Sequence, residues 1–211
     1  MARSFKEAKS EINDLLWEIG WNEKKTLAAA TGIGVVVGHY LNDVSGALLW
    51  GFIGLFAGAV VWVAGTRYIN QNYESILDGF YHEAADTAQE LLRLEEEDNV
   101  ETYSLHAGTG SRPLRTPNLK YSTSTMLVTD YSLIVHEGNE LDMVDLSAEI
   151  SQSTEEIYFD QVASVNYEPD NNEFWVNRAD GHGMSWKSDR EPDDALDDIQ
   201  RRVRDYKRQS A

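Results

Sequence analysis

The histidine side chains are the first candidates for chemistry, and their spacing argues against it. The chain contains five of them: His39, His82, His106, His136 and His182. No two are spaced as in a His-x-x-x-His metal site with an acidic partner. Thiolate ligands and disulfides are excluded because the chain contains no cysteine. We therefore expect neither a metal nor a cofactor.

Other motifs that could carry catalysis are incomplete. The glycine-rich GTGSR at 108–112 lacks the Lys-Ser that follows in a phosphate-binding loop. No Gly-x-Ser-x-Gly nucleophile motif occurs. Acidic clusters at 95–98 and 193–198 could hold divalent cations, but such charge runs are usually solvated surfaces. The sequence thus predicts a protein that is not an enzyme.

An uncharged stretch over residues 44–64 organises the rest of the chain. Its twenty-one residues read VSGALLWGFIGLFAGAVVWVA. A helix of about 20 apolar residues spans the hydrocarbon core of a bilayer. A helix of a soluble core rarely runs so far without a polar face. The stretch predicts a transmembrane helix, and a buried helix of a soluble bundle is the alternative.

A second uncharged segment, residues 26–41, precedes this stretch. The two segments predict a transmembrane helical hairpin over residues 26–66, although sixteen residues also suit a re-entrant helix. Lys24 and Lys25 precede the first segment and Arg67 follows the second, whereas the turn contains neither Lys nor Arg. Positive residues favour the cytoplasmic side. We therefore expect a two-span protein of the cell membrane with both termini in the cytoplasm.

Four glycines mark where these helices could approach one another. Gly34 and Gly38 are four residues apart, as are Gly54 and Gly58, so each pair lies on one helix face. Small residues at that spacing let helix backbones pack closely, either within the chain or between subunits. We expect packing within the chain for at least one pair.

Residues 1–25 contain a helical apolar stripe that begins at Phe5 and ends at two tryptophans. Trp17 and Trp21 stand just before the membrane segment, and indoles favour the membrane interface. The stripe predicts an amphipathic interfacial helix with these two side chains as anchors. A helix packed on the chain's own later helix is the alternative.

Beyond Arg67 the sequence predicts that the helix continues as a juxtamembrane stalk over residues 67–98. Apolar residues recur there every three or four positions, as in a heptad seam. They are Ile69, Tyr73, Ile76, Phe80, Ala84, Thr87, Leu91 and Leu94. Such a seam could form a homo-oligomer by pairing subunits through the 69–94 helix. The alternative is that it packs on the soluble domain.

Turn residues and a change of period mark a second domain. Gly, Pro, Ser and Thr are frequent at 107–118 and predict a linker over residues 99–119. Apolar residues alternate from residue 120 onward, as in strands. Turn signals separate these strands at 129–130, 137–139, 169–172 and 180–181.

The chain closes with an amphipathic segment at 192–208. Asp193 and Asp194 lie in its first turn and basic residues in its last, which suits a helix dipole. Its apolar stripe predicts one buried face. The members of this stripe are Ala195, Ile199, Val203 and Tyr206.

Several segments combine into a recognisable order of strands and one terminal helix. They are MLVTDYSLIV (126–135), EEIYFDQVASVNYE (155–168), EFWVNRADGHGMSWK (173–187) and the 192–208 helix. This order resembles a pleckstrin-homology-like domain of the bacterial and archaeal type, and Ile157, Val162 and Val165 match a pattern of that family. The resemblance implies an antiparallel β-barrel with a C-terminal helix over residues 120–211. With the hairpin and long helix that precede it, the sequence predicts an α+β membrane protein.

Some members of that family bind phosphoinositides through basic residues of the first hairpin. Here the first clear hairpin reads HEGNE and is acidic. The basic cluster nearby consists of Arg112, Arg115 and Lys120. These three side chains are the candidates for contact with anionic lipid headgroups.

Charge is distributed unevenly along the chain. Residues 1–66 carry five basic and six acidic side chains, whereas residues 67–211 carry thirteen and thirty, a net charge of −17. Such an acidic part repels phosphate, so we expect no nucleic-acid partner. Abundant carboxylates, more Arg than Lys and no Cys resemble proteins of salt-loving archaea, in which molar salt screens self-repulsion. An ordinary acidic protein is the alternative.

These features predict a membrane-anchored, non-enzymatic scaffold that presents a cytoplasmic domain to a protein partner. A structural membrane protein of a virion or vesicle, linking the bilayer to a protein shell, fits the same sequence. A small channel subunit fits less well, because the spans offer few polar groups for a pore. Those groups are Thr26, Thr31, His39 and Ser45.

Overall fold

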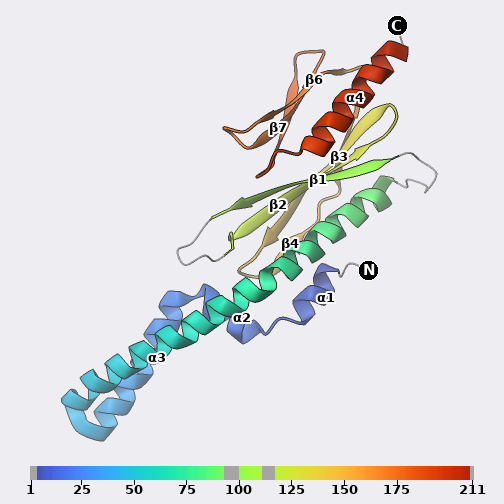
Figure 1. Ribbon diagram of the computed structural model, residues 1–211. Helices are drawn as coiled ribbons and strands as arrows, with labels where there is room; N and C mark the ends of the chain where they lie inside the picture. The colour runs from blue at the N-terminus through green and yellow to red at the C-terminus, as the bar shows by residue number, and fades with distance from the viewer. Residues whose placement is uncertain (1–3, 93–99, 111–116, 210–211) are drawn as a thin grey trace. The chain divides into compact units, whose positions relative to one another are not determined.

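The computed structural model describes residues 4–92, 100–110 and 117–209, without the side chains of residues 42, 43 and 92. The chain divides into two compact units (Figure 1). The helical unit is built mainly from residues 6–77. The sheet unit is built from residues 4–5, 78–92, 100–110 and 118–209.

Two short helices, rather than one, precede the long helix. α1 (Phe5–Ser10) and α2 (Asp14–Trp21) are separate because the Asn13 side chain accepts a hydrogen bond from the Leu16 N–H and caps α2. Trp17 and Trp21 are each only 2 % exposed, and their rings meet edge to face. The prediction of one interfacial helix anchored by these indoles is therefore wrong, since both side chains are buried inside the chain.

α2 packs on α3 (Glu23–Leu92), the longest helix of the chain. The indole N–H of Trp62 donates to the Gly20 carbonyl oxygen at 3.1 Å. A Cβ at Gly20 would overlap the backbone of Gly65, so the two backbones touch directly. The alternative of a helix packed on the chain's own later helix is the one observed.

α3 is helical from Glu23 to Leu92 but is not straight. A Cβ at Gly38 would meet the carbonyl oxygen of Gly46, and one at Gly34 would meet that of Trp50, closer than real Cβ atoms approach. A straight α-helix would place residues 38 and 46 about 12 Å apart. The chain therefore reverses between them, and two helical segments run side by side in opposite directions (Figure 1).

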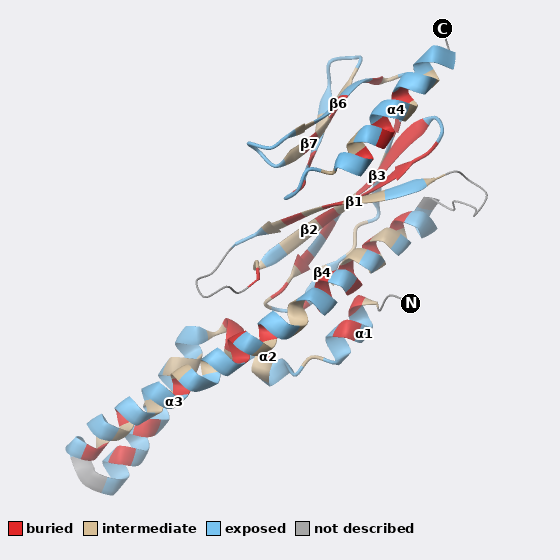
Figure 2. Ribbon diagram, in the orientation of Figure 1, coloured by how far each residue is buried: buried red, intermediate tan, exposed pale blue. Residues whose placement is uncertain are grey.

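One part of α3, from Val44 to Leu91, is long and apolar enough to cross a membrane. Only 11 % of its most apolar 18-residue window is buried, whereas the core helix of a soluble protein is mostly buried. Figure 2 shows that the exposed residues predominate in the first half of this part of α3, whereas buried residues are frequent in its second half. This exposure agrees with the prediction of a transmembrane helix at 44–64, while a second span over 26–41 stays a prediction.

The apolar stripe of the predicted stalk is covered in part within the chain. Its members Ile69, Ile76, Phe80 and Ala84 are buried, Tyr73 and Thr87 are half-buried, Leu91 is exposed, and Leu94 lies outside the described residues. Pairing of subunits through the 69–94 helix would need this stripe at the surface. The chain itself therefore buries much of this stripe, and pairing of subunits through the 69–94 helix stays a prediction.

The sheet unit contains a five-stranded antiparallel sheet. β1 pairs with β2 and β2 with β3, while β3 pairs with β5 near its start and with β4 at its end. The strand bounds are β1 (Glu101–Thr109), β2 (Lys120–Val128), β3 (Ser132–Asp142), β4 (Ser147–Glu149) and β5 (Ser153–Tyr158).

A three-stranded antiparallel sheet and a helix follow. The sheet has the order β6 (Val162–Glu168), β7 (Glu173–Arg178) and β8 (Gly183–Lys187). α4 (Asp193–Gln209) has the predicted stripe on its inner side, with Ala195, Ile199 and Val203 buried. The turns predicted at 129–130, 169–172 and 180–181 are all present between strands.

One hydrophobic core joins both sheets and α4. It includes Met126, Val128, Leu133, Val135, Phe174, Val176, Trp186, Ile199 and Val203. The opposite face of β2 and β3 is also covered, because Leu127 and Ile134 pack against Ala88 of α3. Burial on both faces explains why these strands read as continuous apolar runs rather than as alternating residues.

The structure corrects three expectations for this unit. The strands form two sheets, and no strand pairing joins them among the described residues, so the predicted closed barrel is wrong. β1 occupies much of the predicted 99–119 linker, because alternate residues Leu105 and Ala107 are buried. The predicted turn at 137–139 lies inside β3, where Gly138 has a φ of +82°. One extra residue of β3 is accommodated there as a bulge opposite β2.

Candidate functional site

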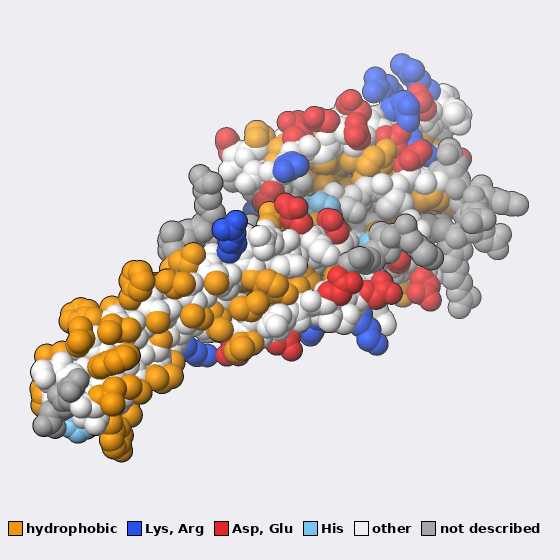
Figure 3. Space-filling view, turned by 60° about the horizontal axis from the view of Figure 1, so that its bottom comes forward, with side chains coloured by type: hydrophobic (Ala, Val, Ile, Leu, Met, Phe, Trp, Pro, Cys, Tyr) orange, Lys and Arg blue, Asp and Glu red, His pale blue; other side chains and the backbone are white. Residues whose placement is uncertain are grey.

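The helical unit exposes a large apolar surface on α3. Figure 3 shows hydrophobic side chains gathered over this region. Its exposed members are Ile33, Val35, Val36, Val37, Tyr40, Leu41, Val44, Leu48, Leu49, Phe52, Ile53, Leu55, Phe56, Val60, Val61 and Val63. Soluble monomers rarely expose a contiguous apolar surface of this extent. The surface is suited to contact with lipid chains.

The four glycines predicted to pack helices lie between the two segments of α3. Gly34 and Gly38 face the backbone of Trp50 and Gly46, as described above. A Cβ at Gly54 would meet the Ala30 carbonyl oxygen, and a Cβ at Gly58 would lie 2.8 Å from the Ala30 side chain. All four contacts are therefore within the chain.

The predicted lipid-headgroup residues are only partly visible. Arg112 and Arg115 lie outside the described residues. Lys120 is exposed at the start of β2, where its ammonium group lies 3.8 Å from a carboxylate oxygen of Asp142. The three basic side chains therefore stay a prediction as a headgroup site.

An open cleft of about 530 Å³ lies in the sheet unit and is a second candidate site. Elements far apart in the sequence build it: the end of α3, strands β1 and β2, and the segment between β8 and α4. Its lining residues are Asp78, Tyr81, Ser104, His106, Tyr121, Ser188, Asp189, Arg190, Glu191 and Pro192.

A stacked pair of rings forms one wall of this cleft. The phenol ring of Tyr81 lies over the imidazole of His106, with ring centroids 3.7 Å apart and planes 21° from parallel. The Thr123 hydroxyl donates to the Leu105 carbonyl oxygen at 3.1 Å and lies 3.0 Å from His106 Nδ1. Because that hydroxyl's only proton is already used, Nδ1 of His106 is the donor to Thr123.

The tautomer assigned to His106 leaves its other nitrogen as an acceptor. None of the described residues hydrogen-bonds Nε2. Burial lowers the pKa of His106 to about 4, although the nearby Asp189 carboxylate acts in the opposite direction. The imidazole is therefore neutral near pH 7, and it offers a lone pair rather than a charge.

Carboxylates dominate the charge of the cleft. Asp189 Oδ2 accepts the Gly108 N–H at 2.8 Å, and the Asp189 N–H donates to the His106 carbonyl oxygen at 2.8 Å, which fixes this segment along β1. Asp78 and Glu191 are exposed at the cleft, and Arg190 is the one cation among the lining residues that the structure describes. The lining thus has an excess of negative charge.

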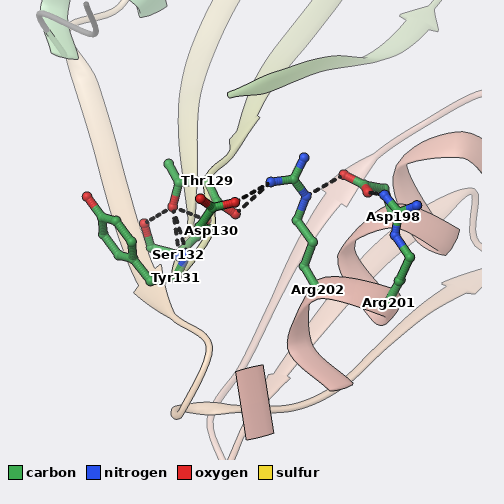
Figure 4. Close-up of polar contacts among 7 residues, drawn as sticks. All are labelled: Thr129, Asp130, Tyr131, Ser132, Asp198, Arg201 and Arg202. Carbon is green, nitrogen blue, oxygen red and sulfur yellow. Dashed lines mark hydrogen bonds and ion pairs between the residues drawn. The ribbon is translucent and has the colours of Figure 1, made fainter. Parts of the chain in front are cut away.

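A polar cluster of a different kind ties α4 to the turn between β2 and β3 (Figure 4). Asp198 is only 6 % exposed and pairs with both Arg201 and Arg202. Arg202 also donates to the Thr129 carbonyl oxygen at 3.2 Å and lies 3.3 Å from Asp130. Since every charge has a partner, we assign this cluster a structural role.

The buried histidine His136, unlike His106, has both ring nitrogens engaged. His136 Nε2 lies 2.8 Å from the Ser151 carbonyl oxygen and must donate to it. The Asn139 amide donates to His136 Nδ1 at 3.3 Å and to the Thr123 carbonyl oxygen at 3.2 Å. These bonds link β2, β3 and the segment before β5, and they leave His136 no free nitrogen for a ligand.

The described residues were searched for groups of side chains that could bind a metal ion. Within residues 4–92, 100–110 and 117–209, no three His, Asp or Glu side chains are grouped so that they could hold an ion. The Tyr81–His106 cleft was missed from the sequence. Its only local signal was His106 in an alternating segment that was interpreted as a linker.

Comparison with known proteins does not assign the chain to a family. No protein-family model matches the chain, and no curated protein is similar to it.

Proposed function

We propose that this chain is a membrane-anchored, non-enzymatic binding protein that crosses the cell membrane twice and holds its sheet unit in the cytoplasm for a protein partner. The observation that carries the proposal is the apolar surface of α3, which extends from Ile33 to Val63. Water solvates such a surface poorly, whereas lipid chains cover it at no comparable cost.

Two features support a pair of spans rather than one. The exposed apolar residues lie on both segments of α3, before and after the reversal. The charged residues Lys24, Lys25 and Arg67 flank the two segments at the ends away from that reversal. Basic residues at both ends favour placing them on the cytoplasmic side.

The sheet unit supports a role in binding. Two antiparallel sheets share one core with a C-terminal helix, an arrangement compatible with a pleckstrin-homology-like domain. In this proposal the unit is the part that recognises a partner. The cleft beside Tyr81 and His106 is a concave surface of this unit, with a volume of about 530 Å³.

Single-cysteine labelling tests the topology directly, because the natural chain has no cysteine. Ser10→Cys, Ser45→Cys and Ser185→Cys place a thiol before, between and after the proposed spans. In whole cells a membrane-impermeant maleimide should label only Ser45→Cys. In inverted vesicles it should label the other two variants and spare Ser45→Cys.

The same experiment can contradict the proposal. Recovery of the unlabelled protein in the soluble fraction without detergent would remove the membrane anchor. Labelling of all three thiols from one side would show that neither segment crosses the membrane. Labelling of Ser10→Cys and Ser45→Cys from one side and of Ser185→Cys from the other would exclude two spans and favour a re-entrant first segment.

A further inference from the structure

We infer that the Tyr81–His106 cleft binds a cationic group, namely the guanidinium or ammonium of an Arg or Lys side chain or of a free organic cation. This inference rests on the proposed function as a binding protein and names the chemistry that its cleft would recognise. Three properties of the lining carry it: acceptor atoms, charge and ring faces.

The acceptor atoms come first. His106 uses Nδ1 to donate to Thr123, so Nε2 keeps a lone pair and has no partner among the described residues. Asp189 uses one carboxylate oxygen for the Gly108 N–H, at 2.8 Å. Its second oxygen has no partner among the hydrogen bonds of the described residues. A ligand that supplies several N–H donors would satisfy these atoms.

The charge of the lining favours the same class of ligand. Among the described lining residues, Asp78, Asp189 and Glu191 contribute three carboxylates, and Arg190 contributes one guanidinium. A carboxylate or phosphate ligand would meet an excess of like charge, whereas a cation would be attracted. Protonation of His106 would add a competing charge, but burial keeps this ring neutral near pH 7.

The ring faces provide the third property. Tyr81 and Tyr121 both line the cleft, and Tyr81 is held in place by its stack on His106. A cation within about 6 Å of an aromatic face gains about 0.5–2 kcal/mol from the ring quadrupole. Planar guanidinium groups also stack on such faces, which a compact ammonium group cannot do.

A binding measurement on the full chain in phosphatidylcholine nanodiscs tests the inference, because a neutral lipid does not itself attract a basic peptide. The probe is a fluorescent Gly-Gly-Arg-Gly-Gly peptide, and the same peptide with citrulline removes only the charge. The arginine peptide should bind at least tenfold more tightly. Competition by N-acetyl-arginine amide at equal strength would indicate a free cation as the natural ligand, and much weaker competition would indicate a protein segment.

Charge variants locate the site. Asp78→Asn with Glu191→Gln should weaken binding of the arginine peptide at least tenfold. Glu90→Gln with Asp170→Asn changes the net charge equally on exposed residues outside the cleft and should change affinity less than twofold. Arg190→Ala should strengthen binding about threefold. Arg204→Ala, at an exposed position of α4, should leave the affinity unchanged.

Equal binding of the arginine and citrulline peptides would overturn the inference, and so would equal losses in the two double variants. Either result would leave the membrane anchor intact, because the cysteine-labelling experiment tests the anchor separately. The two proposals can therefore fail independently.

Discussion

Gly38 illustrates how single residues determine the helical unit. The Gly46 carbonyl oxygen occupies the space in which a Cβ at position 38 would lie. Gly32 is in the same helical segment, and a Cβ there would meet nothing within 4 Å. Substitutions at Gly38 and Gly32 can therefore be compared to separate the effect of helix packing from the effect of glycine on helix stability.

We predict that Gly38→Ala destabilises the protein by about 1–3 kcal/mol, because the added methyl group must push the two helical segments apart. Gly32→Ala should be neutral or stabilising by up to about 1 kcal/mol, since Ala favours a helix over Gly. Thermal unfolding of both variants in the same detergent measures the difference. Equal stability of the two variants would contradict the packing described for Gly38.

The contribution of His106 to the stability of the folded protein should depend on pH. The folded-state pKa of about 4 lies below the usual value of 6.5, so the unfolded chain binds a proton first as the pH falls. The stability that this ring contributes is complete above pH 6.5 and decreases as the pH falls from 6.5 to 4. The loss is at most about 3 kcal/mol, and it does not grow below pH 4.

An NMR titration of the His106 ring measures this pKa in the folded protein. Tyr81→Leu removes the stacked phenol, so water should reach the imidazole and its pKa should rise toward 6.5. A titration midpoint near 6.5 in the unmodified protein would show that the ring is not buried as described.

At the scale of elements, an ion pair holds α4 against the turn between β2 and β3. Arg202 contacts Asp198 on its own helix and Thr129 and Asp130 on the turn. The turn is itself ordered by Thr129, whose hydroxyl accepts the Ser132 N–H at 2.9 Å. The cluster therefore fixes the direction of α4 across the core more specifically than its apolar stripe alone.

We predict that Arg202→Leu destabilises the sheet unit by about 3 kcal/mol, because it leaves the buried Asp198 carboxylate with Arg201 as its remaining basic partner. Arg204→Leu removes the same group from an exposed position of α4 and should change stability by less than about 0.5 kcal/mol. Thermal unfolding of the two variants compares them. Similar losses would mean that Arg202 contributes no more than a surface charge.

The same scale shows what a helical repeat can and cannot predict. The spacing from Ile69 to Ala84 predicted an apolar stripe, and most of its side chains are buried. A heptad-like spacing does not say which surface covers it, because a partner subunit and the chain's own elements bury apolar area equally well. Here the chain itself buries Ile76 and Phe80 but leaves Leu91 exposed.

At the scale of the whole molecule, the net charge of −18 should make stability depend on salt. Repulsion among the carboxylates is screened as the Debye length falls from about 10 Å at 0.1 M salt to about 3 Å at 1 M. We predict that raising KCl from 0.1 M to 1 M raises the Tm by several degrees. A sorbitol series is the control without ions, and a Tm that falls or stays constant in KCl would contradict the prediction.

The sequence by itself determined the features that depend on neighbouring residues. The uncharged run at 44–64 predicted an apolar helix, the stripe at Ala195 and Ile199 predicted the inner face of α4, and Asp180-Gly181 predicted a hairpin turn. Periodicity and turn chemistry are local, so a single sequence reveals them.

Only the tertiary structure decided which surfaces meet. It buried Trp17 and Trp21, turned part of the predicted linker into β1, made Gly138 a bulge rather than a turn, and stacked Tyr81 on His106. Each of these outcomes depends on a partner distant in the sequence. Burial is non-directional and can be satisfied by many partners, so spacing alone does not identify the one that is used.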